Sequence, residues 1–400
     1  PVPHKGWKGI RNSSEHGSFC ANKFGFFGVE GTAGGSEDCL FLNVYTPNLK
    51  HSHAVMFWIH GGAFMSGNGD SMIYGPGPLV SENVVIVTIN HRYSAFGFLS
   101  TNDEFAPGNQ GMKDIILALK WVQQNINQFG GDPDRMPTPF ALVPFDFAPS
   151  VDSKISSEEK FLTETPLEVM KSGKFRKIPM MVGGTDFEGM FVALLLHNLD
   201  VLTLYNENLD FVVPISYDIS RLTNSSKMNQ ALKILKKLYF DDKPKGTLSD
   251  WLNVFSDYIF RYPSDRAVKF YADAETSPIF VYEFKFEGSM NFFKKILGLD
   301  KFEGTCHGDE LFYLFDTDLP NFEVDTESSL MRQRMTSMWA NFAKFGNPTP
   351  QINNLLKVSW NSYTNVQHDF LEIGAELHDR QQRTRLDSLR QMQLDITGHY

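Results

Sequence analysis

Residues 55–67 read VMFWIHGGAFMSG, and this stretch decides the fold prediction for the whole chain. The apolar residues 55–59 end abruptly at His60 and two glycines. An uninterrupted apolar run that stops at turn residues is typical of a strand buried on both faces, as in a parallel sheet. Glycines directly after such a strand let the backbone approach a ligand closely, with free N–H groups. The stretch therefore predicts a buried strand that delivers backbone donors to a pocket.

Other segments extend this pattern in both directions. Residues 38–45 (DCLFLNVY) and 84–89 (VVIVTI) are strand-like, and residues 108–129 carry apolar side chains at the 3.6-residue period of a helix. Apolar strands that alternate with amphipathic helices indicate an α/β fold, with a mostly parallel central sheet flanked by helices. We expect further strands at residues 178–182 and 279–284, and further helices at 166–172, 227–240, 328–345 and 386–396.

Composition limits the possible partners. The 400-residue chain has a formal charge of −10, so it repels phosphate backbones and no nucleic-acid partner is expected. No uncharged apolar run approaches the ~20 residues of a membrane-spanning helix, so no transmembrane segment is expected. The chain begins at Pro1 with no visible leader or anchor, and a secreted and an intracellular location are both compatible with the sequence.

The three cysteines allow two interpretations. Cys20 and Cys39 lie 19 residues apart around a glycine-rich loop that a disulfide could close, which would leave Cys306 over. Three free thiols in a reducing compartment fit the sequence equally well.

Four parts are needed for ester hydrolysis by a serine enzyme: a nucleophile, a base, an acid that orients the base, and oxyanion donors. The glycine loop at residues 60–64 could supply the donors. Glu188 directly follows an apolar strand, where side chains reach the carboxyl edge of a sheet, and is the candidate acid. His307 lies in a loop beside a glycine and is the candidate base, because imidazole transfers protons near neutral pH.

Neither a metal site nor another cofactor is expected. Asp309 and Glu310 follow His307 closely, but no second His or Cys stands at ligand spacing.

The nucleophile is the part that the sequence lacks. No Gly-x-Ser-x-Gly motif, which places a reactive serine on a strand-to-helix turn, occurs in the chain. Ser36, Ser66 and Ser289 do not follow a buried strand and open a helix. After residues 130–133 close the long helix, a further parallel strand should begin, but residues 136–140 (MPTPF) contain two prolines that a central strand does not tolerate.

Taken together, these motifs resemble the type-B carboxylesterase family, which includes the cholinesterases. The resemblance covers most of the chain, and in detail it is closest to the insect α-esterase branch. It rests on SEDCLFLNV (36–44), HGGAF (60–64), NHRY (90–93), FGFL (96–99), GNQG (108–111), FGGDP (129–133), the Glu188 and His307 loops, and FGNP (345–348).

The family resemblance implies an α/β-hydrolase fold in a single domain over residues 1–400, acting on a small-molecule carboxylic ester. It assigns no role to Cys306. By resemblance, the triad acid and base are Glu188 and His307, the oxyanion donors are Gly62 and Ala63 with Gly61 supporting the turn, and the first disulfide joins Cys20 and Cys39.

Two departures from the family pattern lead to further expectations. The family continues from FGGDP into the nucleophile strand and a Gly-Glu-Ser-Ala-Gly elbow, whereas this chain jumps ahead at Met136/Pro137. The resemblance thus implies an internal deletion of roughly 30 residues or more, the size of a strand–helix unit. The family's strands before Trp7 are also absent, which implies a truncated N-terminus.

We therefore expect an incomplete serine esterase without activity in this form. The alternative is a non-catalytic, cholinesterase-like binding or adhesion module.

Overall fold

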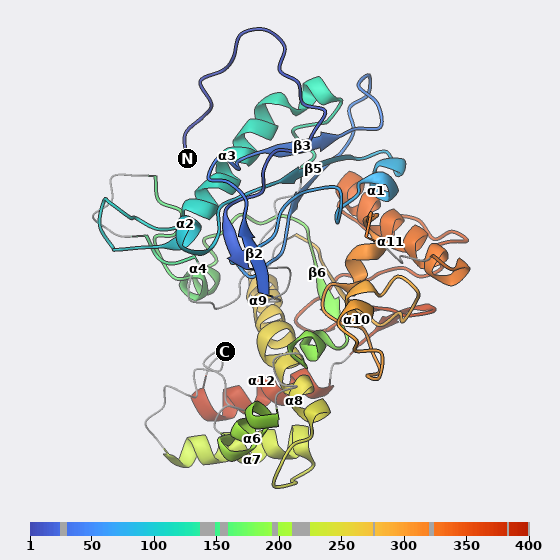
Figure 1. Cartoon of the computed structure of the whole chain (residues 1–400). Coiled ribbons are helices and arrows are strands. Elements are labelled where there is room, and N and C mark those ends of the chain that lie inside the picture. Colours follow the sequence, from blue (N-terminus) through green and yellow to red (C-terminus); the bar gives the residue numbers. More distant parts are fainter. Residues whose placement is uncertain are drawn as a thin grey trace. The chain divides into compact units, whose positions relative to one another are not determined.

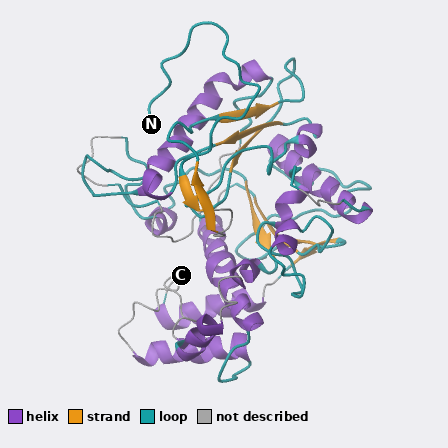
Figure 2. Ribbon diagram, in the orientation of Figure 1, coloured by secondary structure: helices purple, strands orange, loops and turns teal. Residues whose placement is uncertain are grey.

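The computed structural model describes residues 1–24, 30–136, 149–152, 159–193, 199–209, 225–274, 277–319, 324–381 and 384–398. Its helices and strands divide between two compact units: unit 1 holds a three-stranded sheet and the two-stranded ribbon of β1 (Asn22–Phe24) and β2 (Glu30–Gly34), and unit 2 holds a four-stranded sheet (Figures 1 and 2). Unit 1 comprises Pro1–Ser172, Phe315–Pro320 and Thr336–Asn347, and unit 2 comprises Gly173–Leu314, Asn321–Met335 and Pro348–Tyr400. Helix α11 (Thr326–Phe345) has residues in both units.

The sheet of unit 1 has the order β3 (Leu42–Tyr45), β5 (Val85–Ile89), β4 (Val55–Ile59). Strand β5 is buried at every residue and pairs parallel with β4 and antiparallel with β3. Helix α3 (Gln110–Asn125) lies along this sheet and packs Ile115 and Val122 against its apolar side chains (Figure 1). The other elements of unit 1 are α1 (Gly77–Ser81), α2 (Ser94–Phe98), η2 (Ile126–Phe129) and α4 (Pro166–Ser172).

Among the described residues, the edge of strand β4 that faces away from β5 is paired only at its start. Gly131 forms a parallel bridge with His53, and the N–H of Val55 donates to the carbonyl of Arg135 over 2.9 Å. Gly131 therefore pairs beside the start of β4 as the first residue of a further parallel strand would, and residues 132–135 turn away from a strand conformation. Within the described part of the chain, nothing pairs with the rest of this edge.

The sheet of unit 2 has the order β6 (Met180–Thr185), β7 (Ile279–Phe284), β8 (Phe370–Ile373), β9 (Leu377–Arg380). Strands β6, β7 and β8 are parallel, and β9 returns antiparallel as a hairpin. Its helices include α6 (Leu199–Glu207), α7 (Ser225–Phe240), α8 (Leu248–Phe255), the π-helix η7 (Ser256–Arg261), α9 (Tyr262–Asp273), α10 (Phe292–Ile296) and α12 (Thr384–Thr397). The fully buried Trp251 of α8 contacts Phe240 of α7 and Phe255 of α8.

The α/β prediction is confirmed, although the sheets are mixed rather than mostly parallel, because β3 and β9 pair antiparallel with their neighbours. The Cys20–Cys39 disulfide is present, and Cys306 is a fully buried free thiol. The break predicted at Met136/Pro137 lies where the described residues stop, because Pro137 is outside them. Among the described residues, no helix is both long and apolar enough to cross a membrane.

Candidate active site

Glu188 and His307 lie 119 residues apart in the sequence and are in direct contact in unit 2. Glu188 follows β6 and opens the short 3₁₀ helix η3 (Glu188–Val192), and His307 stands two residues before the 3₁₀ helix η8 (Asp309–Tyr313). Glu188 Oε2 lies 2.6 Å from His307 Nδ1, and its Oε1 accepts the N–H of Thr185, also over 2.6 Å. Because both oxygens of this buried carboxylate have partners, Glu188 holds the imidazole in one orientation.

Packing also positions the two side chains. The His307 ring lies against Phe191 and Phe260, with centroid distances of 5.3 and 4.7 Å, yet its side chain is still 36% exposed. At Gly184, a Cβ atom would stand 2.2 Å from Glu188 Oε1, so only glycine fits there. The imidazole is therefore fixed on the side of the acid while part of it stays accessible.

Two further carboxylates anchor the loops that carry Glu188 and His307. Asp186 Oδ1 accepts both the N–H of Thr305 (2.8 Å) and its hydroxyl (2.6 Å). Asp309 accepts the N–H of Cys306 (2.8 Å) and that of Lys294 (3.1 Å). This anchoring role was not predicted for either carboxylate. The sequence indicates it only by position, since Asp186 lies two residues before Glu188 and Asp309 two residues after His307.

Buried charges set the protonation of this cluster. Burial works against the charged form of His307, but the adjacent carboxylate of Glu188, with Glu310 and Asp309, outweighs it and raises the pKa of His307. Burial and the repulsion of Glu188 raise the pKa of Glu310 to about 8, and burial raises that of Asp309 to about 7. Glu310 Oε2 is buried without a hydrogen-bond partner among the described residues, which fits a protonated carboxyl at neutral pH.

These shifts predict that the free energy of unfolding falls as the pH rises from about 5 to about 9. The folded-state pKa values of Glu310 and His307 lie above their ordinary values, so the native state binds more protons in this window. Each contribution is complete below the unfolded-state pKa and is lost as the pH passes the folded-state pKa. One group gives a slope of at most about 1.4 kcal/mol per pH unit.

Urea denaturation across this pH range measures the effect. Glu310→Gln should flatten the profile, while the matched control Glu376→Gln, at a side chain that is 65% exposed, should leave it unchanged. Stability that rises with pH over this range would contradict the prediction.

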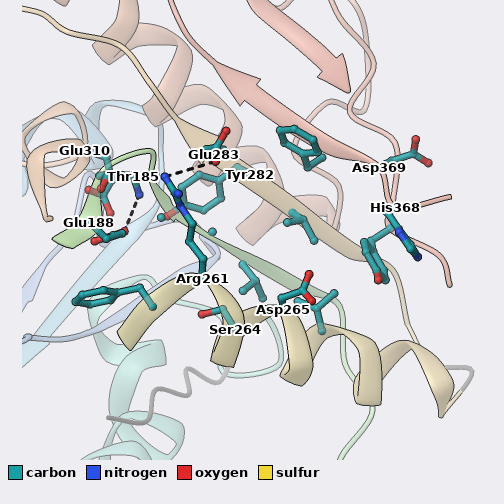
Figure 3. Close-up of a pocket in the computed structure, with 18 of the residues that line it drawn as sticks. Thr185, Glu188, Arg261, Ser264, Asp265, Tyr282, Glu283, Glu310, His368 and Asp369 are labelled. Atoms are coloured by element: carbon teal, nitrogen blue, oxygen red, sulfur yellow. Dashed lines mark hydrogen bonds and ion pairs between the residues drawn. The ribbon is translucent and has the colours of Figure 1, made fainter. Parts of the chain in front are cut away.

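A cavity of about 160 Å³ adjoins the pair within unit 2. Strands β6 and β7 line one wall, and Arg261, Ser264 and Asp265 from η7 and α9 line the opposite one. Figure 3 shows Glu188 and Glu310 at one end, and His368 and Asp369 at the other. Glu188 and His307 thus border a space with both apolar and charged walls.

The glycine loop predicted to bind an oxyanion lies in unit 1. Its carbonyl at Gly62 accepts the N–H groups of Met65 (2.9 Å) and Ser66 (3.1 Å), which closes a tight turn. Ala63 and Phe64 adopt left-handed backbone angles, with φ of 57° and 61°, at a cost on the order of 1 kcal/mol each. Within the described part of the chain, the N–H groups of Gly62 and Ala63 meet no acceptor. The strained turn therefore presents two unused backbone donors.

His60 stabilises this turn through a hydrogen bond to the carbonyl of Gly61. It stacks on His91 at a ring-centroid distance of 4.6 Å, and both are buried. Burial, together with His91, lowers the pKa of His60 to about 3, so the ring is neutral. Its Nδ1 then carries the proton and donates to the carbonyl of Gly61 over 2.7 Å. That contact makes His60 a positioning group.

A carboxylate-bound imidazole behind the carboxyl end of a parallel strand is the arrangement of an α/β-hydrolase. The structure agrees in fold: it matches the crystal structure of juvenile hormone esterase from Manduca sexta, with OTFP covalently attached, at a TM-score of 0.83. The match covers 99% of this chain and 91% of that one, at 22% sequence identity.

The sequence pattern of the Carboxylesterase family matches residues 1–137 and 141–394, so the chain belongs to this family of carboxylic ester hydrolases. Juvenile hormone esterase of Tribolium castaneum is 29% identical over 471 positions, which cover 90% of this chain and 78% of that protein. Esterase FE4 of Myzus persicae is 28% identical over 466 positions, covering 90% and 80%. Both alignments are longer than the 400-residue chain, so these relatives contain stretches without a counterpart in it.

Proposed function

We propose that the protein descends from a serine carboxylesterase in which Glu188 and His307 are the acid and base of acyl transfer. The observation that carries the proposal is the 2.6 Å contact between Glu188 Oε2 and His307 Nδ1. In such a reaction the serine attacks the ester carbonyl while His307 takes its proton, and Glu188 stabilises the resulting imidazolium. Water then repeats the attack on the acyl-enzyme.

Gly62 and Ala63 are the proposed oxyanion donors, with Gly61 shaping the turn. Their support is the pair of N–H groups that no acceptor uses in the described part of unit 1. The proposed substrate class is an uncharged or aliphatic carboxylic ester. The reaction as derived uses only protein side chains, backbone donors and water.

The serine of this mechanism belongs to a strand–elbow–helix segment that the 400-residue sequence does not contain. Three observations support an internal deletion next to Met136. Gly131 forms a single parallel bridge beside the start of β4 that is not continued as a strand among the described residues. The edge of β6 opposite β7 has no described partner strand either. The family match is also interrupted at residues 138–140.

Sequencing transcripts across the codons for Met136 and Pro137 tests this proposal. We expect a longer transcript that encodes a Gly-x-Ser-x-Gly segment at this point. A gene with no such segment, and a single transcript that encodes residues 136 and 137 consecutively, would contradict it.

A non-catalytic binding module is the second candidate, and the cavity beside His307 favours it. An intact cavity of about 160 Å³ could bind a small ligand without turning it over. In that case the 400-residue protein should unfold in one sharp thermal transition, whereas a molten, aggregating product would count against a stable module.

A further inference from the structure

A serine–histidine contact lies in unit 1, separate in sequence from the Glu188–His307 pair. The Ser71 hydroxyl lies 2.9 Å from Nε2 of His16, and the other ring nitrogen, Nδ1, lies 3.1 Å from Asn43 Oδ1 and 3.6 Å from Asp70 Oδ1. A hydroxyl on one imidazole nitrogen and an orienting acceptor on the other is the signature of an activated nucleophile.

The hydrogen bonds of Asn43 decide which ring nitrogen of His16 carries the proton. The Asn43 amide nitrogen donates to the hydroxyl of Thr88 (3.1 Å) and to the carbonyl of Gly69 (3.3 Å), so its oxygen faces the imidazole. An amide oxygen can only accept, so Nδ1 of neutral His16 must be the donor. Nε2 then has a free lone pair, and it accepts the hydroxyl proton of Ser71.

The residues around Ser71 are fixed by strand pairing and by hydrogen bonds to strand β5. Asn43 and Thr88 are paired residues of β3 and β5. The carbonyl of Gly69 also accepts the Thr88 hydroxyl over 2.6 Å, and its N–H donates to Asn90 over 2.9 Å. A Cβ atom at Gly69 would stand 2.7 Å from the carbonyl oxygen of Ile89, so the loop lies directly on the end of β5. Ser71 therefore lies two residues after Gly69, whose position these hydrogen bonds fix.

The segment that carries His16 is held as well. A Cβ atom at Gly17 would stand 2.2 Å from the ring of Phe41, which shows how closely the backbone lies on that ring. The carbonyl of Ser18 accepts a hydrogen bond from Asn90 over 3.2 Å, and Cys20 is tied to Cys39 by the disulfide. The histidine side chain is still 37% exposed, so a small reagent can reach it.

We propose that Ser71 and His16 form a second nucleophile–base pair that reacts with small activated carboxylic esters and with fluorophosphonates. With an ester, the Ser71 oxygen bonds to the carbonyl carbon while its proton moves to Nε2 of His16. The bond to the leaving alcohol then breaks, and that oxygen takes the proton from His16. Water hydrolyses the acyl-serine by the same route, which releases the acid and restores both side chains. With a fluorophosphonate, fluoride leaves and the serine stays phosphonylated.

Asp70 and Asn43 are positioning residues in this arrangement. The carboxylate of Asp70, 22% exposed, stabilises the imidazolium that forms when His16 takes the proton. The backbone N–H groups of Ser71 and Met72 meet no acceptor among the described residues and can stabilise the developing oxyanion. Ser71 does not match the nucleophile motif Gly-x-Ser-x-Gly, because Ile73 stands where its second glycine would be.

Fluorophosphonate labelling of the 400-residue protein, with the modified residue located by mass spectrometry, tests this pair. We expect the label on Ser71, at least tenfold less of it in Ser71→Ala and His16→Gln, and no change in the control Ser81→Ala. No change is expected in His307→Ala either, which separates this proposal from the one for Glu188 and His307. A label on another serine, or equal labelling in Ser71→Ala, would contradict the proposal and leave the Ser71–His16 contact with a structural role only.

A thiol version of the site provides a second measurement. Ser71→Cys should react with iodoacetamide at neutral pH at least tenfold faster than Ser81→Cys, because His16 favours the thiolate. His16→Gln in the Ser71→Cys background should return the rate to that of the control. Equal rates for the two cysteines would overturn the proposal even if both proteins fold normally.

Discussion

His307→Ala is expected to lower kcat for a p-nitrophenyl ester by roughly a million-fold in a form of the protein that carries the nucleophile segment. Loss of the triad histidine costs about this much in the protease subtilisin, where the triad acts as a unit. The reason here is that His307, fixed by Glu188 at 2.6 Å, is the proposed proton acceptor of the reaction. Glu188→Gln should cost about 10⁴-fold, because an amide favours the wrong tautomer of the imidazole.

The measurement needs a family strand–elbow–helix segment inserted between Met136 and Pro137, with steady-state kinetics on the purified protein. His378→Ala, at an exposed histidine of β9, is the matched control and should keep full activity. In a Ser71→Ala background, which removes the second proposed nucleophile, activity that survives His307→Ala, or equal turnover by the 400-residue form, would show that the acid–base assignment is wrong.

Asp257→Asn is expected to destabilise the protein by about 3–5 kcal/mol, the cost of leaving buried charges without their partner. The carboxylate of Asp257 is fully buried and joins three elements of unit 2. It accepts the hydroxyl of Tyr239 in α7 (2.7 Å), and it pairs with Arg261 in η7 (3.2 Å) and Arg385 in α12 (2.5 Å). Asparagine keeps the shape but removes the charge that both guanidinium groups face.

Chemical denaturation of the wild type and the variant measures this loss. Asp241→Asn is the control, because the Asp241 side chain is 86% exposed and its ion pair with Lys243 should contribute no more than about 1 kcal/mol. A change of less than about 1 kcal/mol for Asp257→Asn would mean that the attraction in this cluster only offsets the cost of desolvating it.

Strands with apolar sequences were the most predictable part of the fold. The bounds of β4 and β7 agree with the prediction, because β4 is an apolar run that ends at turn residues and β7 is rich in β-branched and aromatic residues, with Glu283 as its one charged residue. Strands β8 and β9 were not predicted. FLEI and LHDR are short and carry charged residues, and β9 lies at the edge of its sheet with alternate residues exposed.

The candidate site was predictable residue by residue but not as a cluster. Glu188 and His307 could be singled out because each lies beside glycines in a loop after a strand. Their contact, and the raised pKa of Glu310 beside them, depend on how segments more than a hundred residues apart pack together. No local pattern records such packing, and the family resemblance supplied it. For the same reason, the hydrogen bonds that Asp186 and Asp309 accept from backbone N–H groups could not be predicted from the sequence.

The cysteine arrangement supplies a built-in reporter of folding. Two of the three thiols are closed in a disulfide, and the third, Cys306, is fully buried one residue from His307. Burial and nearby carboxylates also raise the pKa of the Cys306 thiol, which keeps it unreactive. A thiol-specific dye should therefore not react with the folded, oxidised protein, and it should label one thiol per chain when unit 2 unfolds. This reaction follows the folding state of the loop that carries His307 without any substrate.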